Sequence, residues 1–476
     1  MTMKRSLALL SLAVAGGAAA ALAAGQGSPP VRAAPAGPPQ PIPAAPPTST
    51  PTLGSGYPFY MPMQGLRRPA NRLLVKCDAS RAAGREVWAG NAGERLGGRA
   101  EGGFEIVYEA KDSAGNPCVY PFSPWLPQIV GSLQGVQFIL RSSIPGERVT
   151  FRTRDEWGGV AIRPLELGRN RIHFEMRDIE LDFPGAIQAK GAVHLEGFGG
   201  AAPGLFTAVI RRCKIFGGKN ALFAPTGQTM LYVEDSEFAG NVGTNVDQEH
   251  STYINGILVS HLRNSTWQGQ RAGGNVASGH QLKDKAYLRI YENVTLINSP
   301  NGGPPSAMPP LDISSFGFTW SNGLRIKRLA PLQSPRDTLV DLRSEIVYGQ
   351  PEIYPWPLTV DPAWRMPADP LGALDKVYLS VFMNTTIDSF RTEPHVFALR
   401  PQGTHLVPGG TLMEGGEWTA RGQQRMVSLA FNTSGSFSRV YSKEGWTYVD
   451  PRLPPQSAWV TDGQAFIRHA LGLIGR

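Results

Sequence analysis

The sequence predicts an all-β solenoid, a parallel β-helix in which short strands wind into stacked coils. The main observation is a strand-like segment that recurs in the middle of the chain. Its equivalent positions are separated by 23, 29 and 29 residues, at Cys213, Ser236, Ser265 and Val294. Gly-Gly and Gly-Asn pairs punctuate alternating apolar and polar residues, as turns between strands do. One such repeat cannot bury its apolar face alone, so stacked neighbours must supply the core.

The same repeat predicts which residues lie side by side. Apolar positions of the four segments keep the same spacings, at Ile215, Phe238, Trp267 and Leu296. Looser copies occur upstream and downstream, at 172–181, 339–347 and 377–387. We therefore expect an N-terminal cap with the first coils over 66–140 and the β-helix proper over 141–455. Asn264 and Asn293 fall in or near the turn register, where a structural ladder is expected rather than glycan attachment.

The N-terminus predicts an exported protein. Lys4 and Arg5 precede an apolar, alanine-rich stretch, and 21–23 read Ala-Leu-Ala, a pattern typical of a signal peptide over 1–24. We expect a periplasmic or secreted protein with no membrane span after signal removal. Residues 25–65 are rich in Pro and Ala and are predicted to form a disordered linker.

The C-terminal region, 456–476, is predicted to contain a short packing helix. Thr461 and Asp462 offer an N-cap, and one helical face would be apolar. That face consists of Phe466, Ile467, Ala470, Leu471 and Ile474. We expect an end cap or a lateral brace.

The chain has three cysteines, which suits one disulfide and one buried thiol in an exported protein. Cys77 and Cys118 flank the predicted cap and are the expected pair. Cys213 occupies a coil position filled elsewhere by Ser and Val, so we expect burial. Their spacing is not that of metal ligands, and we assign no metal site.

Chemistry-bearing residues gather in two segments that are 30 positions apart. The interval separates His250 from His280, Tyr253 from Lys283, and Asn255 from Lys285. If the repeat is a coil, equivalent residues lie about 4.8 Å apart on neighbouring coils. The expected cluster is Asp247, Glu249, His250, Tyr253, Asn255, His280, Lys283, Asp284 and Lys285.

These segments also carry a resemblance to a known family. The export signal, the imperfect coils, and the motifs at 250–253 and 279–283, His-x-x-Tyr and Gly-His-x-Leu-Lys, resemble bacterial right-handed parallel β-helix proteins. That pectate-lyase-like superfamily includes polysaccharide lyases, epimerases and some glycoside hydrolases, and the two motifs look like those of its periplasmic members. The resemblance covers roughly 140–450 and implies a right-handed β-helix. Fold alone does not fix the activity.

The residue types in the cluster suit β-elimination of a uronate. That reaction needs a cation for the sugar carboxylate, a base for the neighbouring C–H, and an acid for the leaving oxygen. We expect Lys283 or Lys285 to neutralise the sugar carboxylate. We expect His250 or His280 to act as the base, and Tyr253 to act as the acid or the base. The expected substrate-binding residues are Asp247, Glu249, Asn255, Lys285, Arg325 and Lys327. In a straight strand His280 and Lys283 would point to opposite faces, so a corner between them is required.

Other functions stay open at this stage. The partial match of Gly279-His280 and Arg325-Ile326-Lys327 to polygalacturonase-like hydrolases keeps hydrolysis as an alternative, although it needs paired carboxyl groups. A glycan-binding β-helix without turnover is the non-enzymatic alternative. Calcium is possible but unassigned, with candidate ligands Asp182, Asp235, Asp247 and Glu249.

The charge of the chain agrees with an acidic glycan as partner. The formal net charge is +8 and the pI is near 9.4. Nucleic acid is not expected, because the chain has no basic run or aromatic recognition motif.

Overall fold

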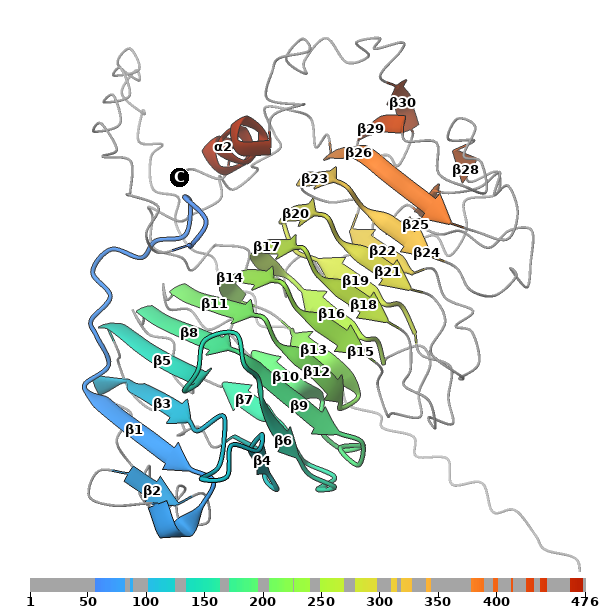
Figure 1. The fold of residues 1–476 in the computed structure, drawn as a ribbon. Coiled ribbons are helices and arrows are strands. Elements are labelled where there is room, and N and C mark those ends of the chain that lie inside the picture. Colours follow the sequence, from blue (N-terminus) through green and yellow to red (C-terminus); the bar gives the residue numbers. More distant parts are fainter. Residues whose placement is uncertain are drawn as a thin grey trace, which may run out of the picture. The chain divides into compact units, whose positions relative to one another are not determined.

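The structure is a computed structural model that confirms the predicted fold class, an all-β parallel β-helix (Figure 1). No helix among its described residues is long and apolar enough to cross a membrane. The predicted signal peptide and residues 25–55 of the predicted linker lie outside the described residues. The structure describes 56–81, 86–88, 102–124, 134–162, 171–195, 205–225, 227–239, 249–268, 279–297, 310–314, 318–327, 340–343, 378–388, 397–400, 412–413, 425–431, 437–442 and 463–473.

From β5 to β25, each coil contributes one strand to each of three parallel sheets. Sheet 1 contains β7 (Val160–Ile162), β10 (Gly191–Leu195), β13 (Asn220–Ala224), β16 (Thr252–Asn255), β19 (Leu282–Lys285), β22 (Leu311–Ser314), β25 (Val340–Arg343) and β27 (Phe397–Arg400), followed by antiparallel β28 (Leu412–Met413). Sheet 2 contains β2 (Glu86–Trp88), β1 (Asn71–Lys76), β3 (Phe104–Tyr108), β5 (Gln134–Ser142), β8 (Arg171–Arg177), β11 (Leu205–Arg211), β14 (Gly227–Glu234), β17 (Ile257–Arg263), β20 (Leu288–Glu292), β23 (Phe318–Asn322) and β26 (Tyr378–Asp388), followed by antiparallel β29 (Arg425–Phe431) and β30 (Phe437–Ser442). Sheet 3 contains β4 (Val119–Tyr120), β6 (Val149–Arg152), β9 (Ile179–Phe183), β12 (Lys214–Gly217), β15 (Glu237–Ala239), β18 (Thr266–Gln268), β21 (Thr295–Ile297), β24 (Arg325–Lys327) and the end of β26.

The predicted register is confirmed in sheet 3 and in the turn before it. Ile215 pairs with Phe238, Phe238 with Trp267, and Trp267 with Leu296. At the turn, the hydroxyl of Ser236 accepts a hydrogen bond from the amide of Cys213 at 3.1 Å. Equivalent residues of successive coils therefore touch, as the spacing predicted.

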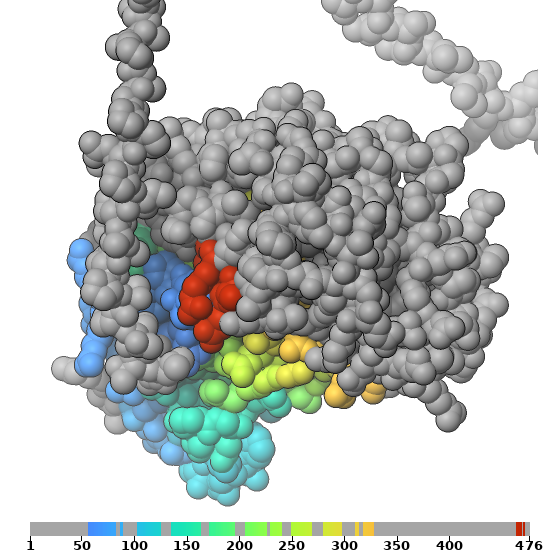
Figure 2. Space-filling model, turned by 90° about the horizontal axis from the view of Figure 1, so that it is seen from above, coloured from blue at the N-terminus to red at the C-terminus, as the bar shows by residue number. Residues whose placement is uncertain are grey.

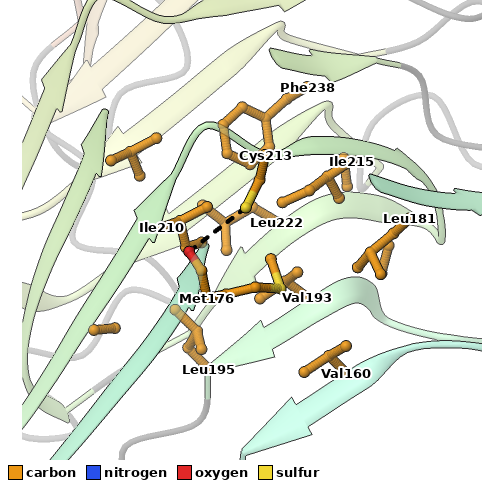
Figure 3. Packing of buried hydrophobic residues seen from close by; sticks show 14 of the residues in the cluster. Val160, Met176, Leu181, Val193, Leu195, Ile210, Cys213, Ile215, Leu222 and Phe238 are labelled. Carbon is orange, nitrogen blue, oxygen red and sulfur yellow. Dashed lines mark hydrogen bonds between the residues drawn. The ribbon is translucent and has the colours of Figure 1, made fainter. Parts of the chain in front are cut away.

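Apolar side chains from all three sheets fill the inside of the coils (Figure 3). Cys213 is fully buried there, as predicted, and its thiol donates a hydrogen bond to the carbonyl oxygen of Met176 at 3.5 Å. Burial raises the pKa of this thiol to about 12. Cys213 is therefore a packing residue in this fold.

The turn between sheets 2 and 3 repeats a left-handed residue in successive coils. Asp235, Asn264 and Asn293 have φ angles of 50°, 48° and 53° there. The side-chain amide of Asn293 donates to Asn264 at 3.1 Å, and that of Asn264 donates to Asp235 at 3.2 Å. Asn and Asp tolerate this conformation, so the predicted structural ladder is confirmed.

The first coils contain the predicted disulfide, Cys77–Cys118. The short 3-10 helix η1 (Ala79–Arg81) follows Cys77 in the chain. Glu109 lies beside the disulfide and accepts a hydrogen bond from the amide of Cys77 at 3.2 Å. Because both sulfur atoms are oxidised, this group of potential ligands offers no thiolate to a metal ion.

The C-terminal helix α2 (Gly463–Leu473) is shorter than the predicted region, but its apolar face is as predicted. Phe466, Ile467, Ala470 and Leu471 are buried, and Phe466 meets Phe318 of β23 with ring centroids 6.2 Å apart. Ile474 lies outside the described residues. Figure 2 shows α2, in red, between the blue N-terminal residues and the later coils.

The end of the predicted linker differs from the prediction. Residues 57–61 were expected to be disordered, and they pack on the outer face of sheet 2. Tyr60 and Met61 are buried, and the guanidinium of Arg468 of α2 lies 4.9 Å from the centroid of the Phe59 ring. Aromatic side chains can bury enough area to offset the cost of ordering a short segment. We call residues 57–61 the strap.

Candidate functional site

The two chemistry-bearing segments lie on adjacent coils of sheet 1. Tyr253 of β16 pairs with Lys283 of β19, and Asn255 pairs with Lys285. Lys283 in turn pairs with Asp312 of β22. His250 and His280 precede their strands, at the corner where each coil enters sheet 1. This corner removes the geometric conflict, and both His280 and Lys283 reach the same carboxylate.

That carboxylate belongs to Asp312, which is fully buried. Its Oδ1 accepts a hydrogen bond from Lys285 Nζ at 2.5 Å. Its Oδ2 lies 3.3 Å from His280 Nε2 and 3.9 Å from Lys283 Nζ. One buried anion thus holds three basic side chains from the neighbouring coil, and such a pairing fixes their positions.

His250 is held beside His280 by main-chain contacts. The amide of His280 donates to His250 Nδ1 at 3.1 Å, and the amide of His250 donates to Asn220 Oδ1 at 2.9 Å. The two imidazole centroids are 5.1 Å apart. The ring of Tyr253 meets the His250 ring edge to face, with centroids 5.4 Å apart.

The surroundings of His250 disfavour its charged form. Burial is the largest cause that lowers its pKa well below the ordinary value, and electrostatic interaction with His280 and with the Lys283 ammonium acts in the same direction. Asp312 opposes the shift. His250 is therefore neutral at physiological pH.

Access to the cluster is through Lys283 and Tyr253. The Lys283 side chain is 12% exposed, whereas Lys285, His280 and Asp312 are each 2% exposed or less at the side chain. The Lys283 ammonium lies 5.0 Å from the centroid of the Tyr253 ring, a cation–π contact. A ligand would meet these two side chains first.

Asp284 was expected in the cluster, and the structure places it inside the coil instead. Strand alternation turns it away from Lys283 and Lys285. It accepts hydrogen bonds from Ser260 Oγ and, at 2.9 Å, from the hydroxyl of Tyr291. Burial raises the pKa of Asp284, while nearby Arg289 opposes the rise.

Only some of the other predicted site residues lie beside the cluster. Glu249 and Asn255 are buried beside the cluster, and the carbonyl oxygen of Glu249 accepts from the amide of Gly279 at 2.9 Å. Asp247 lies outside the described residues. Arg325 and Lys327 are exposed on β24 of sheet 3, so they are not brought to the cluster.

The three calcium candidates that the structure describes are not gathered into one cage. Asp182 is on β9 in sheet 3, where its Oδ2 accepts from Arg152 at 2.8 Å. Asp235 belongs to the turn ladder. Neither therefore joins Glu249, which lies at a corner of sheet 1.

A second polar cluster, not predicted from the sequence, lies under the strap on the outer face of sheet 2. The buried carboxylate of Glu175 accepts hydrogen bonds from Tyr57 of the strap and from Arg177. Burial alone would raise the pKa of Glu175, but interaction with His173, whose Nε2 lies 3.7 Å away, and hydrogen bonds from Arg177 dominate and lower it to about 2. The guanidinium of Arg211 lies 4.8 Å from the Tyr57 ring centroid.

Further along the strap, Tyr60 completes a chain of hydrogen bonds. Its hydroxyl is 2.8 Å from His261 Nδ1, and His261 Nε2 is 2.7 Å from Glu292 Oε2. The hydrogen bond from His261 lowers the pKa of Glu292. Both nitrogens of His261 therefore have partners.

Two features escaped the sequence analysis. Asp312 was not predicted to join the cluster, although Leu282 and Leu311 continue the repeat at 29 residues and place it beside Lys283. The strap was not predicted, because it lies at the end of a Pro-rich stretch that is typical of a linker. Its signal was the pair of tyrosines, Tyr57 and Tyr60, in a segment otherwise typical of a linker.

Fold and cluster together define the chain as a parallel β-helix protein with a basic, imidazole-rich cluster on one sheet. No protein-family model, curated protein or solved structure matches the chain.

Proposed function

We propose that this protein is an exported carbohydrate-active enzyme, a polysaccharide lyase that cleaves an acidic glycan by β-elimination. The observation that carries the proposal is the arrangement around Asp312. Two ammonium groups and an imidazole contact one buried carboxylate, with Tyr253 and a second imidazole beside them. These are the group types that the reaction requires.

The roles follow from position. Lys283, the most accessible cation, neutralises the uronate carboxylate and so acidifies the adjacent C–H. His280 removes that proton, because a contact from Nε2–H to Asp312 leaves the basic lone pair on Nδ1. Electrons of the C–H bond form the C=C bond, the C–O bond to the leaving sugar breaks, and Tyr253 protonates the departing oxygen. An unsaturated uronate and a new reducing end result.

Three observations support an exported protein that acts on an anionic polymer. The Cys77–Cys118 disulfide is typical of proteins that fold in an oxidising compartment, such as the periplasm or the cell exterior. The net charge of +8 favours association with anionic polymers. The resemblance to pectate-lyase-like β-helix proteins adds a family that includes such lyases.

Hydrolysis is less well supported than elimination. Inverting or retaining hydrolysis requires a protonated carboxyl group as general acid. Asp312 is the counter-ion of three basic side chains, and Asp284 faces the interior. Neither is placed to protonate a leaving oxygen.

The test is a panel of uronate-containing bacterial and plant polysaccharides. Ultraviolet absorbance follows the unsaturated product, and a reducing-end assay runs in parallel. Wild type is compared with Lys283→Ala, and Lys214→Ala on sheet 3 serves as the matched control. We expect absorbance that Lys283→Ala abolishes and Lys214→Ala preserves.

Other outcomes reassign the protein. Reducing ends without absorbance would indicate a hydrolase. Binding of a glycan without either signal would indicate a non-catalytic glycan-binding β-helix.

A further inference from the structure

Three histidines among the described residues have a buried Nε2 without a hydrogen-bond partner, His173, His194 and His250, and of these His250 lies beside Lys283 and Lys285. A buried polar atom without a partner costs free energy, and such atoms often mark a place where a ligand or water binds. His261 on sheet 2 is the counterexample, because Tyr60 and Glu292 engage both of its nitrogens.

The contacts of His250 determine which nitrogen carries the proton. A main-chain amide can only donate, so the 3.1 Å contact from the His280 amide requires a lone pair on His250 Nδ1. The ring is neutral in its buried, cation-rich surroundings, and its one proton must then be on Nε2. The unpartnered atom is therefore a donor, which cannot act as a base.

The groups facing His250 indicate what this donor would bind. From its own coil comes Tyr253, from the next coil His280, Lys283 and Lys285, and from β22 Asp312. Among the side chains whose charges act on His250, two ammonium groups and one carboxylate are present, so positive charge predominates in these interactions. This field favours an anionic oxygen over a neutral one.

We propose that His250 is fixed as the neutral tautomer with its proton on Nε2, and that this N–H donates to an anionic oxygen of the bound ligand, a sugar-acid carboxylate. His250 is thus a positioning residue, and the base is His280. The tautomer follows from the contact between the His280 amide and His250 Nδ1, whereas the identity of the ligand rests on the proposed function.

The tautomer is measured on the full-length protein with ring-¹⁵N-labelled histidine, from two-bond ¹H–¹⁵N correlations. Loss of one ring signal in His250→Gln assigns His250. We expect the neutral pattern with the proton on Nε2, unchanged from neutral to mildly acidic pH. A ring with its proton on Nδ1, or one that becomes an imidazolium over that range, would overturn the inference.

The ligand is tested by titration with D-galacturonate, with D-galactose as the neutral control. The His250 signal should shift with the acid and not with the neutral sugar, and the His261 signal should respond to neither. No shift with D-galacturonate, D-glucuronate or inorganic phosphate would overturn the anionic ligand. These spectra require no turnover, so an inactive protein with the expected spectra would refute the lyase proposal and leave this inference standing.

Kinetics on the preferred glycan separate positioning from catalysis. Gln retains an N–H near the Nε2 position, so His250→Gln should raise KM less than tenfold, whereas His250→Leu should raise it about tenfold to a hundredfold with kcat little changed. Both variants should keep the pH profile of the wild type. Equal loss of kcat in both variants would assign His250 as the base and refute the proposal.

Discussion

The outer faces of sheets 1 and 2 each carry a histidine within a charged cluster, and these two histidines, His250 and His261, differ in how completely their ring nitrogens are paired. On sheet 2, the strap and neighbouring arginines engage Glu175, and His261 has partners on both nitrogens. On sheet 1, three basic groups contact Asp312, and His250 Nε2 has no partner among the described residues. His173 Nε2 on sheet 2 also has no hydrogen-bond partner among the described residues, so the contrast is between His250 and His261. A ring with both nitrogens paired is typical of a structural role, and an unpaired ring nitrogen beside basic side chains is typical of a ligand site.

The largest stability effect is expected when the central anion of sheet 1 is neutralised. Asp312→Asn leaves Lys285 buried without its counter-ion and should lower the free energy of unfolding by about 3–5 kcal/mol. The matched change on sheet 2, Glu292→Gln, affects a side chain that is 35% exposed and should cost less than about 1 kcal/mol. Urea denaturation at neutral pH measures both, and equal losses would show that Asp312 contributes no more than a surface pair.

On sheet 2, Glu175 should contribute most to the loss of folding stability at acidic pH. Its pKa is about 2 in the folded protein and 4.5 in the unfolded chain, so its contribution is complete above pH 4.5 and is lost as pH falls toward 2. Glu175→Gln should lower stability at neutral pH by on the order of 3 kcal/mol, a deficit that shrinks below pH 4.5. Denaturation across this pH range checks it. A deficit independent of pH would contradict the lowered pKa.

His250 should give sheet 1 a different pH signature, at higher pH. The pKa of His250 in the folded protein lies well below the 6.5 of the unfolded chain. As pH falls, this side chain therefore binds a proton more readily in the unfolded state. Stability should therefore fall below pH 6.5 with a slope of up to about 1.4 kcal/mol per pH unit. His250→Gln should flatten this part of the curve, and His261→Gln is the control. An unchanged slope in His250→Gln would show that His250 is charged when folded.

The smallest effect is expected from loosening the strap. Tyr60→Phe removes the hydroxyl that contacts His261 and should cost about 1 kcal/mol, because one buried hydrogen bond is lost while the ring remains. Limited proteolysis should then cut between residues 57 and 61 more readily than in wild type. Unchanged cleavage would show that ring packing alone holds the strap.

The sequence predicted the fold and the alignment of coils because the repeat has strong apolar periodicity. Equivalent residues such as Tyr253 and Lys283 followed from the 30-residue offset. Strand alternation could also have placed Asp284 inside, since it lies between Lys283 and Lys285. Arg325 and Lys327 were assigned to substrate binding from a motif match, and their strand belongs to sheet 3 rather than to the sheet that holds the cluster.

Other features required coordinates. The contact of His250 Nδ1 with the His280 amide depends on the corner between sheets, which no residue pattern specifies. The packing of the strap joins Tyr57 to Glu175, 118 residues away, and a Pro-rich sequence gives no register for such a contact.

The most direct test of the comparison is one substitution made on each sheet. His280 lies 3.3 Å from Asp312, and His261 lies 2.7 Å from Glu292, so His280→Gln and His261→Gln remove similar groups. On a uronate polysaccharide that the wild type cleaves, His280→Gln should reduce formation of the unsaturated product by roughly 10²–10⁴-fold, whereas His261→Gln should retain it. Equal activity of the two variants would contradict the assignment of the sheet 1 cluster as the catalytic site.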